Sequence, residues 1–186
     1  ENEITAIFDQ MVNELMALLP DFGKHLAIDG KKLPTHARPN KEKKADDGRR
    51  DTDADFGKKV YRGKREDGTM WEKVVSWFGY RLHLVVDSKY ELPVAFNVTK
   101  ASLGETPQAH ALLDNMENKH PDLLRRCKYF TADRGYDGSE LICRLWDKYS
   151  IKPIIDIRNM WKDGEKTHLV EGRGNVVYDY CGNVYC

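Results

Sequence analysis

The stretch Cys127-Lys-Tyr-Phe-Thr-Ala-Asp-Arg-Gly-Tyr-Asp137 decides which fold is expected for this chain. Its first six residues are mostly apolar, which predicts a short buried strand that ends at Asp133. Gly135 then permits a tight turn. Asp137-Gly-Ser-Glu140 has the form of a capping box, with Asp in the Ser/Thr position, so a helix should follow. Strand, turn and helix in this order are typical of an α/β sheet.

The same alternation continues on both sides of this stretch. Ile151–Ile157 predicts another strand, and Thr106-Pro107 predicts the start of an earlier helix that runs to about Lys119, with Thr as N-cap and Pro at the first helical position. The apolar faces of the two helices are expected to comprise Leu112, Leu113 and Met116 in the first and Leu141, Ile142, Leu145, Trp146 and Tyr149 in the second.

The N-terminal part predicts a helix followed by a strand. Pro20 and Gly23 end the helix. His25–Asp29 is an apolar run that Gly30 stops, so it reads as a buried strand with a carboxylate at its C-terminal end. The apolar stripe of the helix consists of Ile4, Phe8, Met11, Leu15, Leu18 and Leu19.

Two alternating runs in the middle of the chain predict a β-hairpin. Gly79–Asp87 and Leu92–Val98 are joined by Ser88-Lys-Tyr-Glu91, which is a short connection between strands. Asp87 at the turn and His83, on the side opposite Leu82, are expected to be structural. The apolar positions that alternate are Tyr80, Leu82, Leu84, Val86, Leu92, Val94, Phe96 and Val98.

Residues 38–72 have a different composition and predict a long solvated loop. Arg38–Arg65 carries eleven basic and six acidic side chains and few apolar ones. The local excess of positive charge, with Phe56 and Tyr61 nearby, suits contact with a DNA backbone. A solvated loop of mixed charge without any ligand is the other interpretation.

Taken together, the elements predict an α/β fold with a mixed sheet flanked by helices. The expected division is an N-terminal helix over 1–24, a core over 25–160 that contains the charged loop 38–72, and the start of a Gly-rich β element over 161–186. The chain opens in a helical pattern without a start methionine and stops in a strand-like pattern, so we expect a fragment of a longer protein.

Composition excludes some classes of protein. Among the 186 residues, Lys plus Arg and Asp plus Glu are both 30, so a nucleic-acid site would have to rest on local charge. No apolar run is long enough to span a bilayer and no signal peptide opens the chain. The four cysteines are therefore expected to be reduced thiols of a cytoplasmic protein.

Asp29 and Asp133 share an unusual setting, because each ends an apolar strand and is followed by a turn that contains glycine. If the two strands are neighbours, both carboxylates converge at one edge of the sheet. They would repel each other unless a cation lies between them. Mg²⁺ prefers such oxygen ligands, and paired ions activate hydroxyls for phosphodiester chemistry. The alternative is that both aspartates are ordinary turn or cap residues.

Four blocks together resemble the DDE transposases of bacterial insertion sequences, in the group whose catalytic domain carries a β-strand insertion. The most specific block is Ala132-Asp-Arg-Gly-Tyr-Asp137, and the resemblance covers roughly residues 25–160. The other blocks are Leu26-Ala-Ile-Asp-Gly-Lys-Lys-Leu33, Gly79-Tyr-Arg-Leu-His83, and Leu92-Pro-Val94 with Thr99-Lys-Ala101.

The resemblance implies a ribonuclease-H-like fold that is truncated here. It implies DNA cleavage and strand transfer with Mg²⁺ or Mn²⁺, on transposon ends and target DNA, by a homodimer of the full-length protein in the bacterial nucleoid. Asp29 and Asp133 match the first two catalytic acids. The third, a glutamate on a later helix, has no match, so it is expected after Cys186 and the fragment should be inactive alone. Glu105 falls where relatives often place an acidic residue, so the resemblance suggests a supporting role for it beside the two aspartates.

Basic side chains near the matched aspartates are candidates for DNA contact. Arg134 directly follows Asp133, and it could equally be a solvated side chain. The remaining candidates are Lys31, Lys32, Arg49, Arg50, Lys58 and Lys59.

Three other functions stay open on the sequence alone. The first is a metal-dependent nuclease of the same fold without strand transfer. The second is an inactive remnant of a transposase that only binds DNA or protein. The third is a zinc-binding module, for which Cys181 and Cys186 could form half a site with His168 or later residues.

Overall fold

A computed structural model describes residues 2–37 and 51–186. Its elements in chain order are α1 (Asn2–Leu18), β1 (His25–Pro34), β2 (Asp55–Lys64), β3 (Met70–Asp87), β4 (Leu92–Lys100), α2 (Glu105–Lys119), α3 (Pro121–Arg126), β5 (Tyr129–Ala132), the 3₁₀ turn η1 (Arg134–Tyr136), α4 (Ser139–Cys143), the π-helical turn η2 (Arg144–Lys148), β6 (Lys152–Ile155), β7 (His168–Leu169), β8 (Val177–Tyr178) and β9 (Val184–Tyr185).

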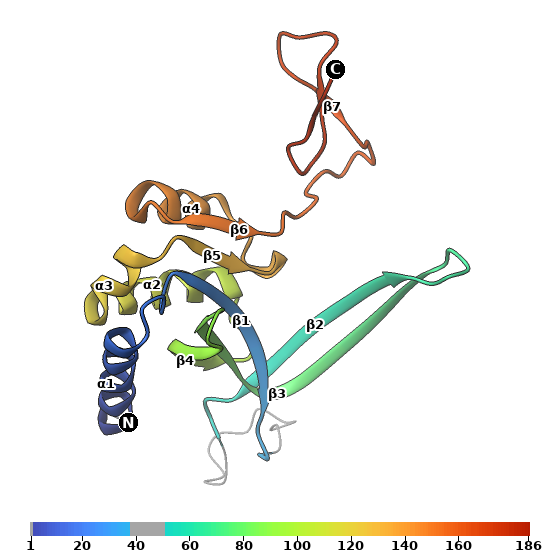
Figure 1. The fold of residues 1–186 in the computed structure, drawn as a ribbon. Helices are drawn as coiled ribbons and strands as arrows, with labels where there is room; N and C mark the ends of the chain where they lie inside the picture. The colour runs from blue at the N-terminus through green and yellow to red at the C-terminus, as the bar shows by residue number, and fades with distance from the viewer. Residues whose placement is uncertain (1, 38–50) are drawn as a thin grey trace.

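The main sheet is mixed and has six strands. Its order is β2-β3-β1-β5-β6, and β4 pairs with β3. β1 is antiparallel to β3 and parallel to β5, which in turn is parallel to β6. The expected α/β class, with a mixed sheet flanked by helices, is therefore confirmed (Figure 1). The predicted hairpin is also confirmed, as the antiparallel pair β3–β4.

A single apolar core lies between the sheet and the helices α2, α3 and α4. Leu26, Ile28 and Phe130 come from the sheet, and α2 contributes Leu112, Leu113 and Met116, as predicted. Full burial of each large apolar side chain contributes roughly 1.5–3 kcal/mol. The predicted face of the later helix is only partly correct, because Leu141 and Leu145 are fully buried whereas Trp146 is 55 % exposed.

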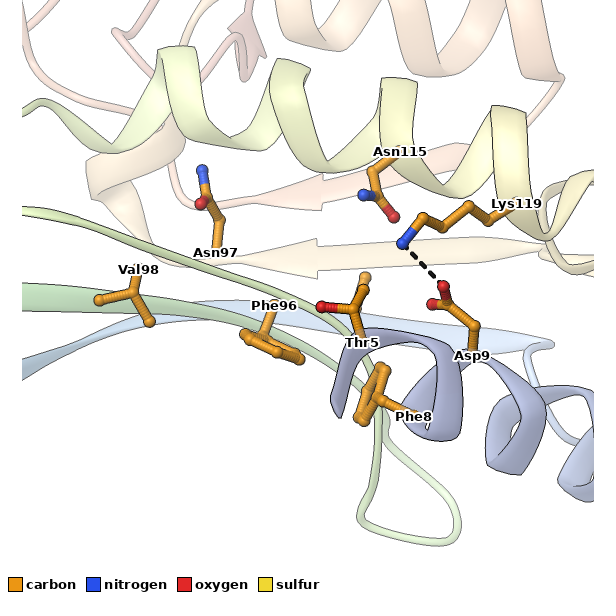
Figure 2. A pocket seen from close by; sticks show the side chains of 9 residues that line it. Thr5, Phe8, Asp9, Phe96, Asn97, Val98, Asn115 and Lys119 are labelled. Carbon is orange, nitrogen blue, oxygen red and sulfur yellow. Dashed lines mark ion pairs between the residues drawn. The ribbon is translucent and has the colours of Figure 1, made fainter. Parts of the chain in front are cut away.

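The face through which α1 packs agrees only in part with the predicted stripe. Val12 is buried, and Phe8, Leu15 and Leu19 lie against the core, but Ile4, Met11 and Leu18 are exposed. Figure 2 shows how the start of α1 meets β4 and α2 around a pocket of about 240 Å³. There Phe8 makes an edge-to-face contact with Phe96, and the Lys119 ammonium lies 2.7 Å from the Asp9 carboxylate. None of the predicted site residues that the structure describes lines this pocket.

The hairpin β3–β4 mostly buries the face that the alternation did not favour, although the predicted position Val94 is fully buried. His83, Val85 and Asp87 are fully buried, whereas the predicted core positions Phe96 and Val98 are 37 % and 48 % exposed. The reason is that α2 packs on the side of the sheet that carries His83. The buried Asp87 carboxylate accepts hydrogen bonds from the backbone N–H groups of residues 23, 89 and 90, so its structural role is confirmed.

The predicted solvated loop 38–72 is wrong over its second half. Residues 55–64 form β2, which pairs along its whole length with residues 70–79 of β3. At about 3.3 Å per residue this hairpin is roughly 30 Å long, and it projects from the sheet as an arm (Figure 1). The sequence did not indicate this strand, because neither face of most of the arm is covered. Its charged side chains therefore show no alternation of polarity. Residues 38–50 lie outside the described part of the chain.

Two predicted helix caps are also wrong. Gly104, not Thr106, is the N-cap of α2, and Gly138 precedes α4, without a side-chain cap in either case. Asp137 instead accepts a hydrogen bond from the Arg158 backbone N–H at 2.7 Å. Among the described residues, no helix is both long and apolar enough to cross a membrane.

A small three-stranded sheet, β7-β8-β9, lies within residues 161–186, where a separate β element is expected. Trp161 stacks on His168 with ring centroids 3.9 Å apart and meets Tyr178 edge to face. This aromatic cluster is the main packing that the small sheet shows.

Candidate active site

Asp29 and Asp133 lie at the point where β1 and β5 separate. The last paired residues of these parallel strands are Ile28 and Ala132. The next residue in each strand is therefore one of the two aspartates, and both are exposed. The prediction that Gly30 ends β1 is wrong, because β1 continues to Pro34 along β3. The predicted convergence of the two strands nevertheless holds, because only the pairing with β5 stops there.

Backbone N–H groups hold one oxygen of each carboxylate. Asp29 Oδ1 accepts from the Gly30 N–H at 2.7 Å, and Asp133 Oδ1 accepts from the Gly135 N–H at 2.8 Å. Asp133 thereby caps the 3₁₀ turn η1. Each carboxylate is thus oriented by its own turn.

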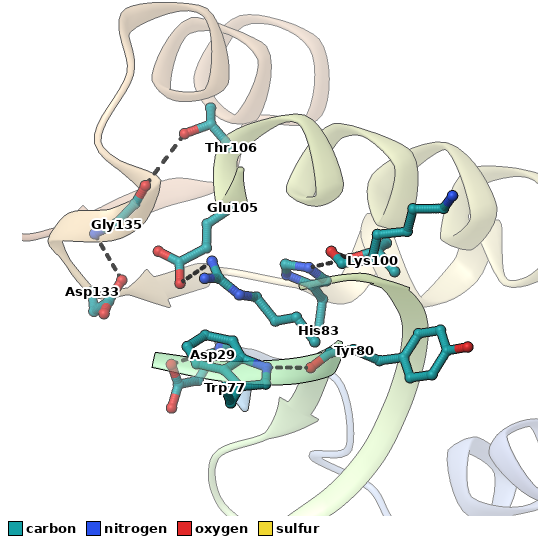
Figure 3. A network of polar contacts seen from close by, with 12 residues as sticks. Asp29, Trp77, Tyr80, His83, Lys100, Glu105, Thr106, Asp133 and Gly135 are labelled. Atoms are coloured by element: carbon teal, nitrogen blue, oxygen red, sulfur yellow. Dashed lines mark hydrogen bonds and ion pairs between the residues drawn. The ribbon is translucent and has the colours of Figure 1, made fainter. Parts of the chain in front are cut away.

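A third carboxylate, that of Glu105 at the start of α2, lies between these two turns (Figure 3). A Cβ atom built on Gly135 would overlap Glu105 Oε2 and would lie 2.8 Å from Asp133 Oδ1. A Cβ atom on Gly30 would lie 3.1 Å from Glu105 Oε1. Glu105 therefore occupies the space that the two glycines leave open.

Arg81 of β3 balances part of this negative charge. Its Nη1 lies 3.0 Å from Glu105 Oε1, and both side chains are largely buried. Burial raises the pKa of Glu105, the Arg81 charge opposes that rise, and the charges of Asp133 and Asp29 add to it. Both aspartates therefore act on the same buried carboxyl group, which is consistent with their adjacent register.

The charge of Arg81 also acts on two buried polar groups, Tyr136 and His83. The Tyr136 hydroxyl would be 3.5 Å from a Cβ on Gly30, and within the described residues it has no hydrogen-bond partner. Burial, together with the charge of Glu105, raises its pKa. His83 Nε2 lies 3.1 Å from Thr99 Oγ1, and burial followed by the Arg81 charge lowers the pKa of His83 to about 4. Both groups are therefore held neutral.

The donor set suits a divalent ion with oxygen ligands. Two exposed carboxylates meet at one edge of the sheet, beside a third whose charge Arg81 only partly compensates. A hard cation such as Mg²⁺ or Mn²⁺ would relieve this repulsion. Within residues 2–37 and 51–186, no set of three or more His, Cys, Asp or Glu side chains is arranged to hold a metal ion. Asp29 and Asp133 are thus the candidate ligands, and Glu105 is tied to Arg81.

A pocket of about 260 Å³ opens beside Asp29. It extends from the candidate site to the base of the β2–β3 arm, and Trp77 is one of its buried walls. Its lining residues are Asp29, Gly30, Lys31, Lys32, Lys59, Tyr61, Val75, Trp77, Arg81 and Glu105.

The predicted DNA-contacting residues are distributed over different places. Lys31, Lys32 and Lys59 line the pocket beside Asp29. Lys58 lies on the opposite face of β2 from Lys59, since the side chains of consecutive strand residues point to opposite faces. Arg134 forms two hydrogen bonds with Asp156 Oδ2, at 2.9 and 2.6 Å, next to Asp133. Arg49 and Arg50 lie outside the described residues.

The C-terminal cysteines do not form part of a recognisable metal site in the described residues. Cys181 and Cys186 are exposed free thiols. His168, the suggested zinc partner, instead places Nε2 2.8 Å from Asp163 Oδ2 and stacks on Trp161.

Comparison with known proteins assigns the family. The transposase DDE domain family matches residues 20–179, which include both aspartates and all strands of the main sheet. The chain belongs to this family of transposase DDE domains. The resemblance to DDE transposases seen in the sequence is thereby confirmed.

The other comparisons add little. A solved structure, that of a piggyBac transposase synaptic complex with hairpin DNA, is 12 % identical with a TM-score of 0.43. The similarity covers 87 % of this chain and 32 % of the other, so the chain spans about a third of that protein's length. No curated protein matches.

Sequence reasoning missed the partners of the two aspartates. Arg81 belongs to the block Gly79-Tyr-Arg-Leu-His83, which carries part of the family resemblance. The sequence therefore drew attention to its position but did not predict its pairing with Glu105. A supporting role for Glu105 was suggested by the resemblance, but its pairing with Arg81 was not predicted. Trp77 was not singled out, although its place in the apolar run Val74–Tyr80, directly after the supposed loop, was the signal that could have placed it in a folded element.

Proposed function

We propose that this DDE domain cleaves DNA at transposon ends and transfers the freed 3′ ends to target DNA, with Asp29 and Asp133 as metal ligands. The observation that carries the proposal is the register of β1 and β5, which makes the two aspartates neighbours at one strand end. When bound, divalent ions supply activation of the attacking hydroxyl and stabilisation of the leaving oxygen.

The chain's own residues would prepare this site. The Gly30 and Gly135 N–H groups orient the carboxylates, and the Arg81–Glu105 pair supports the two turns from below. Lys31, Lys32 and Lys59 line the neighbouring pocket, and they would bind phosphates of the DNA strand that enters it. We further propose that the third acid comes from beyond Cys186, because Glu105 is already paired.

The test is cleavage of transposon-end DNA by the full-length transposase with Asp29→Asn or Asp133→Asn. Each change should lower Mg²⁺-dependent cleavage by more than about a hundredfold, since even the outer partners of metal ligands are worth 10–100-fold. Asp147→Asn, which removes an exposed carboxylate of η2, is the matched control and should leave cleavage unchanged. Equal cleavage by all three variants would refute the proposal.

The same assay separates the competing functions. Cleavage without joining of the 3′ end to target DNA would favour a nuclease of the same fold. Binding of DNA without any cleavage by the unsubstituted protein would favour an inactive remnant. Both outcomes contradict the strand-transfer part of the proposal, and the second contradicts the catalytic part as well.

A further inference from the structure

One face of the β2–β3 arm combines aromatic and basic side chains. Alternate residues of a strand share a face, and so do directly paired residues of neighbouring strands. The register pairs Lys59 with Val75, Tyr61 with Lys73, and Gly63 with Trp71. We call the face formed by Lys59, Tyr61, Trp71, Lys73, Val75 and Trp77 the pocket face, because four of these residues line the pocket beside Asp29.

Two glycines shape this face. Gly57 lies opposite Trp77 and Gly63 opposite Trp71. A Cβ atom on either glycine would lie 2.6 Å from the Cε2 atom of the paired indole, so each ring lies across its glycine. Glycine weakens a strand unless another group needs the space. Its repetition opposite both tryptophans therefore keeps the two rings flat along the arm.

The aromatic rings of the arm differ in exposure. Trp77 is 8 % exposed, its Nε1 donates to the Tyr80 carbonyl at 2.9 Å, and the Arg81 guanidinium lies over its ring at 5.4 Å. Tyr61 and Trp71, farther out, are 44 % and 36 % exposed. The buried ring thus anchors the arm, and the two outer rings are available for stacking.

The charge on the pocket face is positive. Among residues 57–63 and 71–77, the charged side chains on this face are Lys59 and Lys73. The acid in these stretches, Glu72, is on the opposite face, where it pairs with Arg62 at 2.7 Å. Lys31 and Lys32 add further cations at the pocket end. This pattern complements a polyanion.

We propose that the pocket face binds an unpaired DNA strand that leads away from Asp29, with Tyr61 and Trp71 stacking on bases and Lys59 and Lys73 contacting phosphates. Single strands are bound in this way by cations that follow the backbone and aromatic rings that stack on bases. A paired duplex would leave both rings unused. The proposal rests on the proposed function for its biological setting, but the binding itself needs no catalysis.

Binding is measured by fluorescence anisotropy with chain 1–186 in EDTA, on a duplex with a single-stranded overhang and on the blunt duplex. Tyr61→Ala with Trp71→Ala should weaken binding to the overhang by at least about tenfold, since each stacked base is worth roughly 1–3 kcal/mol. Binding to the blunt duplex should change little. Phe56→Ala with Met70→Ala, which removes two exposed side chains from the opposite face, is the matched control and should preserve both affinities.

Salt dependence tests the lysines. Lys59→Ala with Lys73→Ala should reduce the slope of log K against log salt for the overhang by about 1.4, at about 0.7 per single-strand phosphate. Lys58→Ala with Lys64→Ala, on the opposite face, should leave the slope unchanged. Equal effects of the two lysine pairs, or of the two aromatic pairs, would overturn the proposal.

A wild-type experiment covers the case in which a variant does not fold. An overhang that carries iodouracil should cross-link to Tyr61 or Trp71 on irradiation, and cross-links confined to other residues would contradict the proposal. A dimer of the chain that Trp71→Ala dissociates would also contradict the proposal, because the pocket face would then be an interface between two copies of the chain. Repeating the anisotropy measurement with Asp29→Asn separates the two hypotheses. Binding of the overhang to the pocket face should persist even where the catalytic proposal fails.

Discussion

Glu105 is the residue on which the geometry of the two aspartates depends. Its carboxylate fills the space beside Gly30 and Gly135, the glycines that follow Asp29 and Asp133 closely in the chain. Arg81 fixes it there by an ion pair of 3.0 Å. The spacing between the two turns is therefore set by a buried charge pair and not by apolar packing alone.

Adding one methyl group tests this contact. Gly135→Ala should destabilise the protein by about 1–3 kcal/mol, the usual cost of overpacking, because the new Cβ would overlap Glu105 Oε2. Urea unfolding measures the change. Gly174→Ala is the control, since a Cβ there meets nothing within 4 Å. Combining Gly135→Ala with Glu105→Ala should cost less than the two single changes together, and strict additivity would show that the contact is absent.

His83 makes stability depend on pH. Its folded pKa is about 4 against an ordinary 6.5, because burial disfavours the imidazolium. The unfolded chain therefore binds the proton first as pH falls. The stability tied to neutral His83 is complete above pH 6.5 and is lost progressively towards pH 4, by up to roughly 3 kcal/mol at 1.36 kcal/mol per pKa unit. The free energy of unfolding of wild type should fall more steeply over this range than that of His83→Gln. Parallel pH profiles would contradict this assignment.

Among the strands of the main sheet, those of the β2–β3 arm have the least protection from solvent. Beyond Trp77 its side chains are mostly exposed on both faces, and several are large and apolar, such as Met70 at 71 % and Phe56 at 57 %. Two-stranded hairpins without a covered face are marginally stable. The arm is therefore expected to open locally without unfolding of the core.

Hydrogen exchange measures this difference. Amides of residues 58–64 and 70–75 should exchange through local opening, faster by at least about a hundredfold than those of β1 and β5, which lie in the middle of the sheet. Equal protection in the arm and in β5 would show that another part of the chain covers the arm.

The elements also show how far local sequence patterns carry. Outside residues 38–72 the order of strands and helices was predicted except for the short helix α3, because apolar runs and turn residues mark the other elements. The arm was missed, since a strand exposed on both faces has no alternation of polarity. The inner face of β3–β4 was assigned wrongly, because His83 and Asp87 are buried through hydrogen bonds that the sequence does not reveal. The caps failed for a similar reason: Asp137 found a tertiary partner in Arg158.

For the whole molecule, the decisive feature is that β1 lies between an antiparallel and a parallel neighbour. The periodicity of the sequence predicted strands β1 and β5. It did not predict that they are adjacent, because adjacency depends on the long-range topology. The family resemblance supplied that step, and the register agrees with it. The Arg81–Glu105 pair and the pocket could not be predicted, because their residues come from β3, α2 and the arm, which only the folded sheet brings together.

The central claim is that Asp29 and Asp133 together bind a divalent ion, and Mn²⁺ titration of ¹⁵N-labelled chain 1–186 tests it most directly. The paramagnetic ion should broaden the amide resonances of residues 28–31 and 132–136 before all others. Asp29→Asn and Asp133→Asn should each abolish this selective broadening, and Asp147→Asn should preserve it. Broadening that begins elsewhere, or that persists unchanged in both aspartate variants, would contradict the claim.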